Sequence, residues 1–136
     1  MPKVLISDKL SEQAVQVFKD RGVDVDVKTG MSPEELIACI GEYDGLAIRS
    51  STKVTPEVLA AATNLKVVGR AGIGVDNVDT PAATQNGVVV MNTPFGNAIT
   101  TAEHAISMMM ALARQIPQAN ESTHQGQWEK SRFRGV

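Results

Sequence analysis

The sequence predicts an α/β fold: a five-stranded parallel sheet with helices on both faces, followed by a long C-terminal helix. The first observation is that short apolar runs alternate with helical segments along residues 1–96. Strands separated by helices run parallel, because a parallel pair needs the crossover connection that a helix supplies. The second is that residues 97–126 keep a helical composition without another strand-like run. The third is a composition of 43% apolar and 21% charged residues, which is typical of a globular domain.

The expected strands are short runs rich in valine, leucine and isoleucine. In chain order they cover residues 4–6, 23–27, 45–48, 66–69 and 88–90. The run 23–27 alternates valine with aspartate, which predicts a strand with one exposed face at an edge of the sheet. The run 45–48 is apolar throughout, which predicts a central strand.

The helices between these strands are expected where a capping residue precedes apolar residues at helical spacing. They cover residues 12–20, 33–41, 56–62 and 80–85. The residues placed to cap them are Ser11, Ser32, Thr55 and either Asp79 or Thr80. Pro33 and Pro56 stand at the first helical position, which suits proline, and Gly22 follows the first helix as a residue type that ends helices.

Residues 97–126 are expected to form a long connecting helix, interrupted at Pro117. Between residues 98 and 113 the segment is apolar on almost every side, and such a helix needs protein around it. We therefore expect a homo-oligomer that forms through this helix, while core packing explains half of these residues equally well. The expected organisation is a sheet domain at 1–96, the connecting helix at 97–126 and a basic tail at 127–136 that leads to a further domain.

Charge and composition argue against several classes of function. Thirteen Lys and Arg against fifteen Asp and Glu give a net charge of −2, which disfavours a nucleic-acid partner. The single cysteine, Cys39, excludes an internal disulfide framework and a cysteine-based zinc site. The sequence has no leader-like segment and no run of about 18 apolar residues, so we expect a cytoplasmic protein without a membrane partner.

Two arginines follow neighbouring strands of the expected sheet. Arg49 comes directly after the run 45–48, and Arg70 comes directly after the run 66–69. Beside Arg49, the hydroxyls of Ser50, Ser51 and Thr52 can add hydrogen-bond donors. Ligands of open parallel sheets bind outside the carboxyl ends of the strands, and arginine pairs well with phosphate or carboxylate. The pattern favours an anion site, and two solvated arginines are the alternative.

A glycine-containing loop, G-I-G-V-D-N at residues 72–77, follows the fourth strand run. It departs from the dinucleotide pattern G-x-G-x-x-G because Asn77 stands at the sixth position and the next helix begins later. We expect the backbone amides of this loop to approach a small ligand, and a tight turn without a ligand is the alternative.

The start of the long helix is a further candidate, and the histidines are not. Asn97 either caps the helix or presents its amide to a ligand, and Thr101 lies in the first turn, where anions are favoured. His104 and His124 lie in the helical segment and not at a strand end, so no catalytic set is predicted. No metal-ligand spacing is present either.

The stretch RAGIGVDNVD at residues 70–79 carries a resemblance, together with IRSSTKVT before it and MNTPFGNAITTAEHAISMMMALARQIPQA after it. Over essentially the whole chain the sequence resembles the NAD-dependent D-isomer-specific 2-hydroxy acid dehydrogenases. The resemblance implies a flavodoxin-like substrate-binding domain, a Rossmann domain inserted after it, and a long helix that joins the two.

Carried over residue by residue, the resemblance implies which positions meet the ligands. Substrate contacts are implied for Arg49, Arg70, Gly72, Gly74, Val75 and Asn97. Ser50 joins these candidates because its hydroxyl stands beside Arg49. Ile73 and Thr101 match positions close to the NAD cofactor.

The arginine pair and Gly96-Asn97 look more like the members that oxidise 3-phosphoglycerate to 3-phosphohydroxypyruvate, the first step of serine biosynthesis. The substrate implied is 3-phosphoglycerate or a related small phosphorylated 2-hydroxy acid. A member of the glyoxylate or hydroxypyruvate reductase type is the alternative. The family's catalytic Arg, Glu and His lie beyond the segment that resembles residues 133–135, so we expect no catalytic residue here, no turnover by this chain alone and no tight binding of NAD.

Two interpretations from other classes stay open. A phospho-acceptor receiver has an acid after its first strand, as Asp8 is here, but it needs an aspartate at the end of its third strand, where Arg49 stands. The other is a non-catalytic flavodoxin-like module that associates with itself through residues 98–113.

Overall fold

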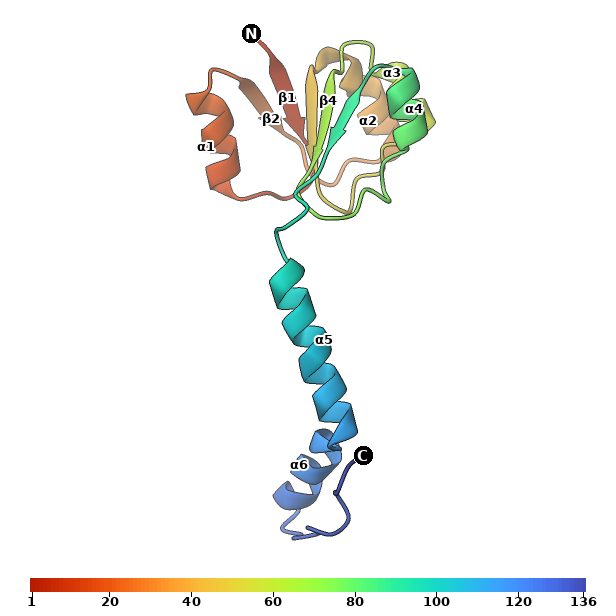
Figure 1. Cartoon of the computed structure of the whole chain (residues 1–136). Coiled ribbons are helices and arrows are strands. Elements are labelled where there is room, and N and C mark those ends of the chain that lie inside the picture. The colour runs from red at the N-terminus through yellow and green to blue at the C-terminus, as the bar shows by residue number, and fades with distance from the viewer. The chain divides into compact units, whose positions relative to one another are not determined.

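The computed structural model describes all 136 residues and divides them into two compact units, Met1–Gly96 and Asn97–Val136. The first unit is built on a five-stranded parallel sheet with the strand order β2-β1-β3-β4-β5 (Figure 1). Its strands are β1 (Lys3–Ile6), β2 (Asp24–Val27), β3 (Gly45–Ile48), β4 (Val67–Arg70) and β5 (Val89–Met91). This is the flavodoxin-like order, so the predicted fold class is confirmed, with β3 at the centre and β2 at an edge.

Four helices connect these strands, and most begin at the predicted caps. They are α1 (Glu12–Asp20), α2 (Pro33–Cys39), α3 (Pro56–Ala61) and α4 (Thr80–Gln85). Ser32 forms a full capping box at the start of α2. Thr55 and Asp79 each accept a hydrogen bond from a backbone amide of the first turn, whereas Ser11 occupies the N-cap position of α1 without such a bond. Gly22, after α1, has the left-handed φ of 70° that favours glycine at a helix end.

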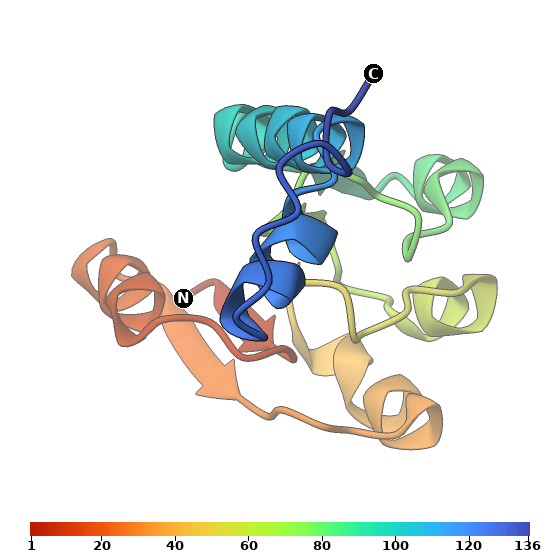
Figure 2. The ribbon, with the colours of Figure 1, turned by 90° about the horizontal axis from the view of Figure 1, so that it is seen from below.

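The helices cover the two faces of the sheet unequally. Helices α2, α3 and α4 lie on one side of the sheet, and α1 lies on the other (Figure 2). The side with three helices holds the larger core, where Leu46 and Val68 of the sheet pack with Leu36 and Leu59 of the helices. The smaller core, beneath α1, includes Ile6.

On the α1 side, the strands β4 and β5 carry no helix of this unit. Val89 and Met91 are 59% and 58% exposed, whereas Val90 between them packs against the larger core. Alternate residues of a strand face opposite sides of the sheet, so the exposed pair faces the α1 side. The sheet therefore has helices on both faces, as predicted, but only one face is covered along its whole width.

The edge strand β2 does not distribute its residues as its alternation predicts. Val27 is 54% exposed, and Asp26 is half-buried. The Asp26 carboxylate lies 2.9 Å from Lys3 Nζ and accepts a hydrogen bond of 2.8 Å from the hydroxyl of buried Tyr43. The hydrogen bonds from Lys3 and then from Tyr43 hold the pKa of Asp26 below its usual range.

The second unit contains two helices where one interrupted helix was expected. They are α5 (Ala98–Ala113) and α6 (Ile116–His124). The break lies at Gln115, whose φ of 52° is in the left-handed region. Pro117 stands in the first turn of α6, where a residue without a backbone N–H is tolerated. The proline therefore belongs to the start of α6 and does not interrupt a helix. The prediction of one helix over 97–126 interrupted at Pro117 is therefore wrong: the interruption comes earlier.

Helix α5 leaves apolar side chains open to solvent along its length. None of its residues is buried, and Ile99 and Leu112 are 74% and 78% exposed. Asn97 occupies its N-cap position without a side-chain cap bond. No helix of the chain combines the length and the apolar character needed to cross a bilayer.

Candidate functional site

The loops that leave the carboxyl ends of the strands meet at one edge of the sheet (Figure 1). In a sheet of this order the connections change direction between β1 and β3, and ligands of such folds bind at that point. Here the point is occupied by the first residues after β1 and by the turn 49–52 after β3. The turn carries Arg49 and Ser50, and both are exposed.

Asp8, shortly after β1, holds the turn 49–52 by its backbone. The residue is 5% exposed, and its carboxylate accepts a hydrogen bond of 2.7 Å from the amide of Arg49. It accepts two more from Thr52, at 3.1 Å from the amide and 2.9 Å from the hydroxyl. The Thr52 hydroxyl also lies 2.8 Å from the hydroxyl of Ser7. The end of β1 and the turn are therefore joined by a buried polar cluster.

Asn77 holds the same turn from the loop after β4. Its Nδ2 donates to the carbonyl of Arg49 at 2.8 Å and to the carbonyl of Thr52 at 2.6 Å. Its Oδ1 is buried and has no hydrogen-bond partner. The residue that breaks the dinucleotide pattern thus joins two loops of the candidate site.

The two predicted arginines have different environments. Arg49 is exposed, and its guanidinium forms no ion pair within the chain. The Arg70 side chain is 11% exposed, lies 3.5 Å from the Asp76 carboxylate, and donates through Nε to the Arg49 carbonyl at 3.2 Å. Its Nη1 donates to the carbonyl of Gly74. Arg70 therefore connects the turn 49–52 to the loop 72–77, and Arg49 is the arginine left free for an external anion.

The glycines of the loop 72–77 allow it to wrap closely around Arg70. A Cβ at Gly74 would lie 2.9 Å from Asp76 Oδ1 and 3.2 Å from Arg70 Nη1. A Cβ at Gly72 would lie 3.4 Å from the same Nη1. Ile73, between the two glycines, is 42% exposed. The close approach to Arg70 is thus a structural reason for Gly74 that the sequence did not reveal.

The loop after β5 supports the loop 72–77 in turn. Asn92 Nδ2 donates to the carbonyl of Ile73 at 2.7 Å, and the amide of Thr93 donates to the carbonyl of Gly72 at 3.0 Å. Three successive loops, after β3, β4 and β5, are therefore cross-linked by hydrogen bonds. Such a support holds the exposed groups of the edge in place before any ligand arrives.

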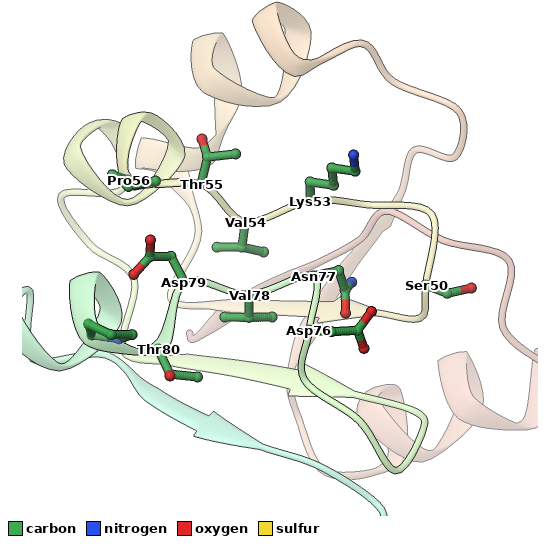
Figure 3. Close-up of a pocket in the computed structure, with 11 residues that line it drawn as sticks. Ser50, Lys53, Val54, Thr55, Pro56, Asp76, Asn77, Val78, Asp79 and Thr80 are labelled. Atoms are coloured by element: carbon green, nitrogen blue, oxygen red, sulfur yellow. The ribbon is translucent and has the colours of Figure 1, made fainter.

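A cleft with a volume of ≈ 620 Å³ lies between the segments 50–56 and 76–81 (Figure 3). Val54 and Val78 lie opposite each other on these segments and pair as an isolated parallel bridge (Figure 3). The charged residues that line the cleft are Lys53, Asp76 and Asp79. Of the predicted site residues only Ser50 lines it, so the cleft lies beside Arg49 and Arg70 and does not include them.

The glycine loop 72–77 and the helix after it do not fit the pyrophosphate of a dinucleotide. That group needs free amides at a helix start directly after a glycine loop. Helix α4 begins only at Thr80, and the carboxylate of Asp79 already accepts the hydrogen bond of the Ala82 amide at 2.8 Å. A carboxylate at this position would repel a phosphate, so residues 70–85 offer no place for that part of NAD.

The structure brings most predicted site residues to one edge of the first unit: Arg49, Ser50, Arg70 and the loop of Gly72, Ile73, Gly74 and Val75. Asn97 and Thr101 belong to the second unit, where both are exposed at the start of α5. Thr52 was expected to offer its hydroxyl to a ligand, but that hydroxyl donates to Asp8 and supports the turn instead. Sequence reasoning missed Asn77 as a support of the site, and it weighed Asp8 only as part of a receiver. An acid that closely follows a buried strand was the available sign for Asp8.

Comparison with known proteins points to one family. A family model described as D-isomer specific 2-hydroxyacid dehydrogenase, catalytic domain, matches residues 4–130. The chain is 54% identical over 134 residues to D-3-phosphoglycerate dehydrogenase of Archaeoglobus fulgidus. The aligned region covers 98% of this chain and 25% of that protein. The chain thus spans about a quarter of the length of the curated relatives it matches.

Solved structures share the fold. A Pyrococcus horikoshii protein superposes with a TM-score of 0.86 at 33% identity, over 96% of this chain and 39% of that one. An NAD⁺-bound 3-phosphoglycerate dehydrogenase of Entamoeba histolytica superposes with a TM-score of 0.71 at 32% identity, over 83% of this chain and 39% of that one.

Proposed function

The chain belongs to the D-isomer specific 2-hydroxyacid dehydrogenase family, and on that premise we propose that it is the substrate-binding part of an NAD-dependent oxidoreductase. The proposed reaction is oxidation of 3-phosphoglycerate to 3-phosphohydroxypyruvate. The observation that carries the proposal is the 54% identity, over 98% of the chain, to a protein named D-3-phosphoglycerate dehydrogenase. When bound, NAD would supply the hydride acceptor.

Arg49 is the residue on which substrate binding chiefly depends in this proposal. Its guanidinium is exposed and unpaired, while its backbone is held by Asp8, Asn77 and Arg70. A guanidinium can form two parallel hydrogen bonds with a phosphate or a carboxylate, which a substrate with both groups provides. Ser50 adds an exposed hydroxyl next to it.

The other substrate contacts are proposed on the family resemblance. They are Arg70, Gly72, Gly74, Val75 and Asn97, with Ile73 and Thr101 close to the cofactor. Arg70 already donates hydrogen bonds to the carbonyls of Arg49 and Gly74. In the proposal it therefore has two roles: it contacts the substrate, and it holds the two loops together. In the proposal the loop 72–75 offers backbone amides to the substrate carboxylate.

This chain alone is proposed to bind substrate without turning it over. Proton transfer from the substrate hydroxyl needs a base at hydrogen-bond distance, and the first unit, which carries Arg49 and Arg70, contains no histidine. The start of α4 also offers no free amides to the pyrophosphate of NAD, because Asp79 already accepts the hydrogen bond of the Ala82 amide. We therefore expect neither NADH formation nor tight NAD binding by the 136-residue chain.

The test is a calorimetric titration of the purified chain with 3-phosphoglycerate and, separately, with NAD, at low salt. Arg49→Ala should weaken phosphoglycerate binding by about tenfold or more, because it removes hydrogen bonds to a charged group. Lys53→Ala is the matched control, since Lys53 is an exposed cation of the neighbouring cleft.

Each outcome distinguishes one alternative. Equal losses in the two variants would indicate bulk attraction of an anion, and a loss only in Lys53→Ala would move the site into the cleft. Tighter binding of glyoxylate or hydroxypyruvate than of 3-phosphoglycerate would favour a reductase of those acids. Tight NAD binding would contradict the proposal that this chain binds the substrate and not the cofactor.

A second proposal concerns self-association through α5. It is favoured by the exposed apolar side chains of that helix, among them Ile99, Ile106 and Leu112. Sedimentation analysis should show a dimer or a larger species, and Ile106→Glu should shift it toward the monomer. A wild-type chain that stays monomeric at high concentration would exclude this proposal.

A further inference from the structure

We infer that Asp8 is a positioning residue for the candidate substrate site, which holds the turn 49–52 and thereby places the side chain of Arg49. The inference rests on the proposed function for its ligand, and on the geometry of the first unit for its mechanism. Neither the sequence pattern nor the family resemblance assigns Asp8 a role in binding.

The carboxylate of Asp8 is directed entirely at the turn. With 5% of the residue exposed, it accepts hydrogen bonds from the Arg49 amide at 2.7 Å, the Thr52 amide at 3.1 Å and the Thr52 hydroxyl at 2.9 Å. No basic side chain forms an ion pair with it. A buried carboxylate is costly unless its oxygens are satisfied, so the turn and Asp8 stabilise one another.

The position of this cluster explains why the turn needs such support. In folds with this strand order, the crevice between β1 and β3 is where a ligand binds. Here Ser7, Asp8 and Thr52 fill that crevice with their own hydrogen bonds. The crevice is thus used to anchor a loop, and the exposed groups available to a ligand are those of Arg49 and Ser50 on the outer side of the turn.

The backbone of Arg49 is held from both of its polar groups. Its amide donates to Asp8, and its carbonyl accepts from Asn77 at 2.8 Å and from Arg70 at 3.2 Å. With both groups satisfied, the direction in which the side chain leaves the backbone is set before a ligand binds. Preorganisation of this kind raises affinity by removing an ordering cost from the binding step. Of the three supports, Asp8 is the one that holds the amide.

Two substitutions of Asp8 separate hydrogen bonding from charge. Asp8→Ala removes every hydrogen bond that the Asp8 carboxylate accepts from Arg49 and Thr52. Asp8→Asn keeps the shape: its carbonyl oxygen can accept from both amides, while its Nδ2 donates to the Thr52 hydroxyl, which then donates to Ser7. Asp24→Ala is the matched control, because Asp24 is an exposed acid on β2 with no hydrogen bond or ion pair through its side chain.

The first measurement is amide hydrogen exchange by NMR, which needs no ligand. Asp8→Ala should raise the exchange rates of the Arg49 and Thr52 amides by about tenfold or more, because both lose a buried acceptor. The amide of Leu46 in β3 reports on global stability, and its exchange rate should rise less than those of the Arg49 and Thr52 amides. If the Arg49 and Thr52 rates stay as in the wild type, the inference is overturned, whatever the ligand result.

The second measurement is an NMR titration with 3-phosphoglycerate, which can follow weak binding. Asp8→Ala should weaken binding by about tenfold, and Asp8→Asn should stay within about threefold of the wild type. In an Arg49→Ala background, Asp8→Ala should add less than about a twofold loss, because it acts through Arg49. Equal losses in both backgrounds would contradict positioning of Arg49 and indicate a general loss of structure.

Failure of the inference and failure of the proposed function give different results. A wild-type chain that binds no 3-phosphoglycerate contradicts the proposed function, and hydrogen exchange then decides alone whether Asp8 orders the turn. If Asp8→Ala does not fold, Thr52→Val replaces it, since that variant removes only the hydroxyl shared with Asp8 and Ser7. Thr52→Val should weaken binding by about threefold, and unchanged binding and exchange in this variant would overturn the inference.

Discussion

Residues 1–96 and residues 97–136 differ in how they are stabilised. The first unit buries a contiguous core on one side of its sheet and a smaller one on the other. The second unit buries a single residue, the polar Ser122, and exposes the apolar side chains of α5. Most of the stability of a helix in a protein comes from the packing of its apolar face, so the second unit depends on a surface that its own residues do not supply. The first unit has an apolar core of its own, and the second does not.

The largest expected effect comes from separating the two units. The fragment 1–96 should unfold cooperatively in urea, because its core is complete within those residues. The fragment 97–136 should show low helicity and no cooperative transition. Circular dichroism of both fragments makes the comparison, and a cooperative transition in the fragment 97–136 at low concentration would break it.

Substitution of matched leucines sharpens the comparison. Leu46 is 1% exposed and Leu112 is 78% exposed. Leu46→Ala should lower the free energy of unfolding by about 2–5 kcal/mol through cavity formation. Leu112→Ala should change the main transition by less than about 0.5 kcal/mol in protein dilute enough to be monomeric. Urea titration measures both values, and a large loss from Leu112→Ala would reveal that α5 is packed in solution.

A smaller effect is expected from the glycine loop of the first unit. Gly74→Ala should cost less than about 1 kcal/mol, because the new Cβ would displace only the side-chain ends of Asp76 and Arg70. Gly96→Ala is the control, since its Cβ would find only ordinary contacts, at 3.7 Å from Thr93. Thermal unfolding decides between them, and equal melting temperatures would show that the loop moves aside freely.

The smallest effect concerns acid stability of the edge strand. Hydrogen bonds from Lys3 and then Tyr43 lower the pKa of Asp26 from 3.8, so its stabilising contribution is fully present above that pH. The contribution is lost as the pH falls through the lowered folded-state pKa. Asp26→Asn should therefore flatten the decline in stability of the first unit below about pH 4. Unfolding midpoints between neutral pH and pH 2 test this, and identical profiles would exclude it.

Most of the fold could be predicted from the sequence, because the relevant interactions are local. The capping box at Ser32 joins residues three positions apart, and the apolar run 45–48 identifies the central strand without any knowledge of its neighbours. The sequence predicts the break between the two helices at Pro117, whereas the structure has it before α6 begins at Ile116. Pro117 is a conspicuous breaker in sequence, but proline suits a first helical turn, and the left-handed residue is Gln115.

The candidate site also combines features that the order of the elements predicts with features that depend on contacts between distant residues. The sequence alone determined that Arg49, Arg70 and the loop 72–77 follow the carboxyl ends of adjacent strands, since that depends only on the order of elements. Only the tertiary structure decided that Arg49 is free while Arg70 is engaged, and that Asp8 anchors the turn. Asp8 and the Arg49 amide are 41 positions apart, and Asn77 and Thr52 are 25 apart. Hydrogen bonds over such separations depend on how the strands are ordered in space, which no local pattern of residues records.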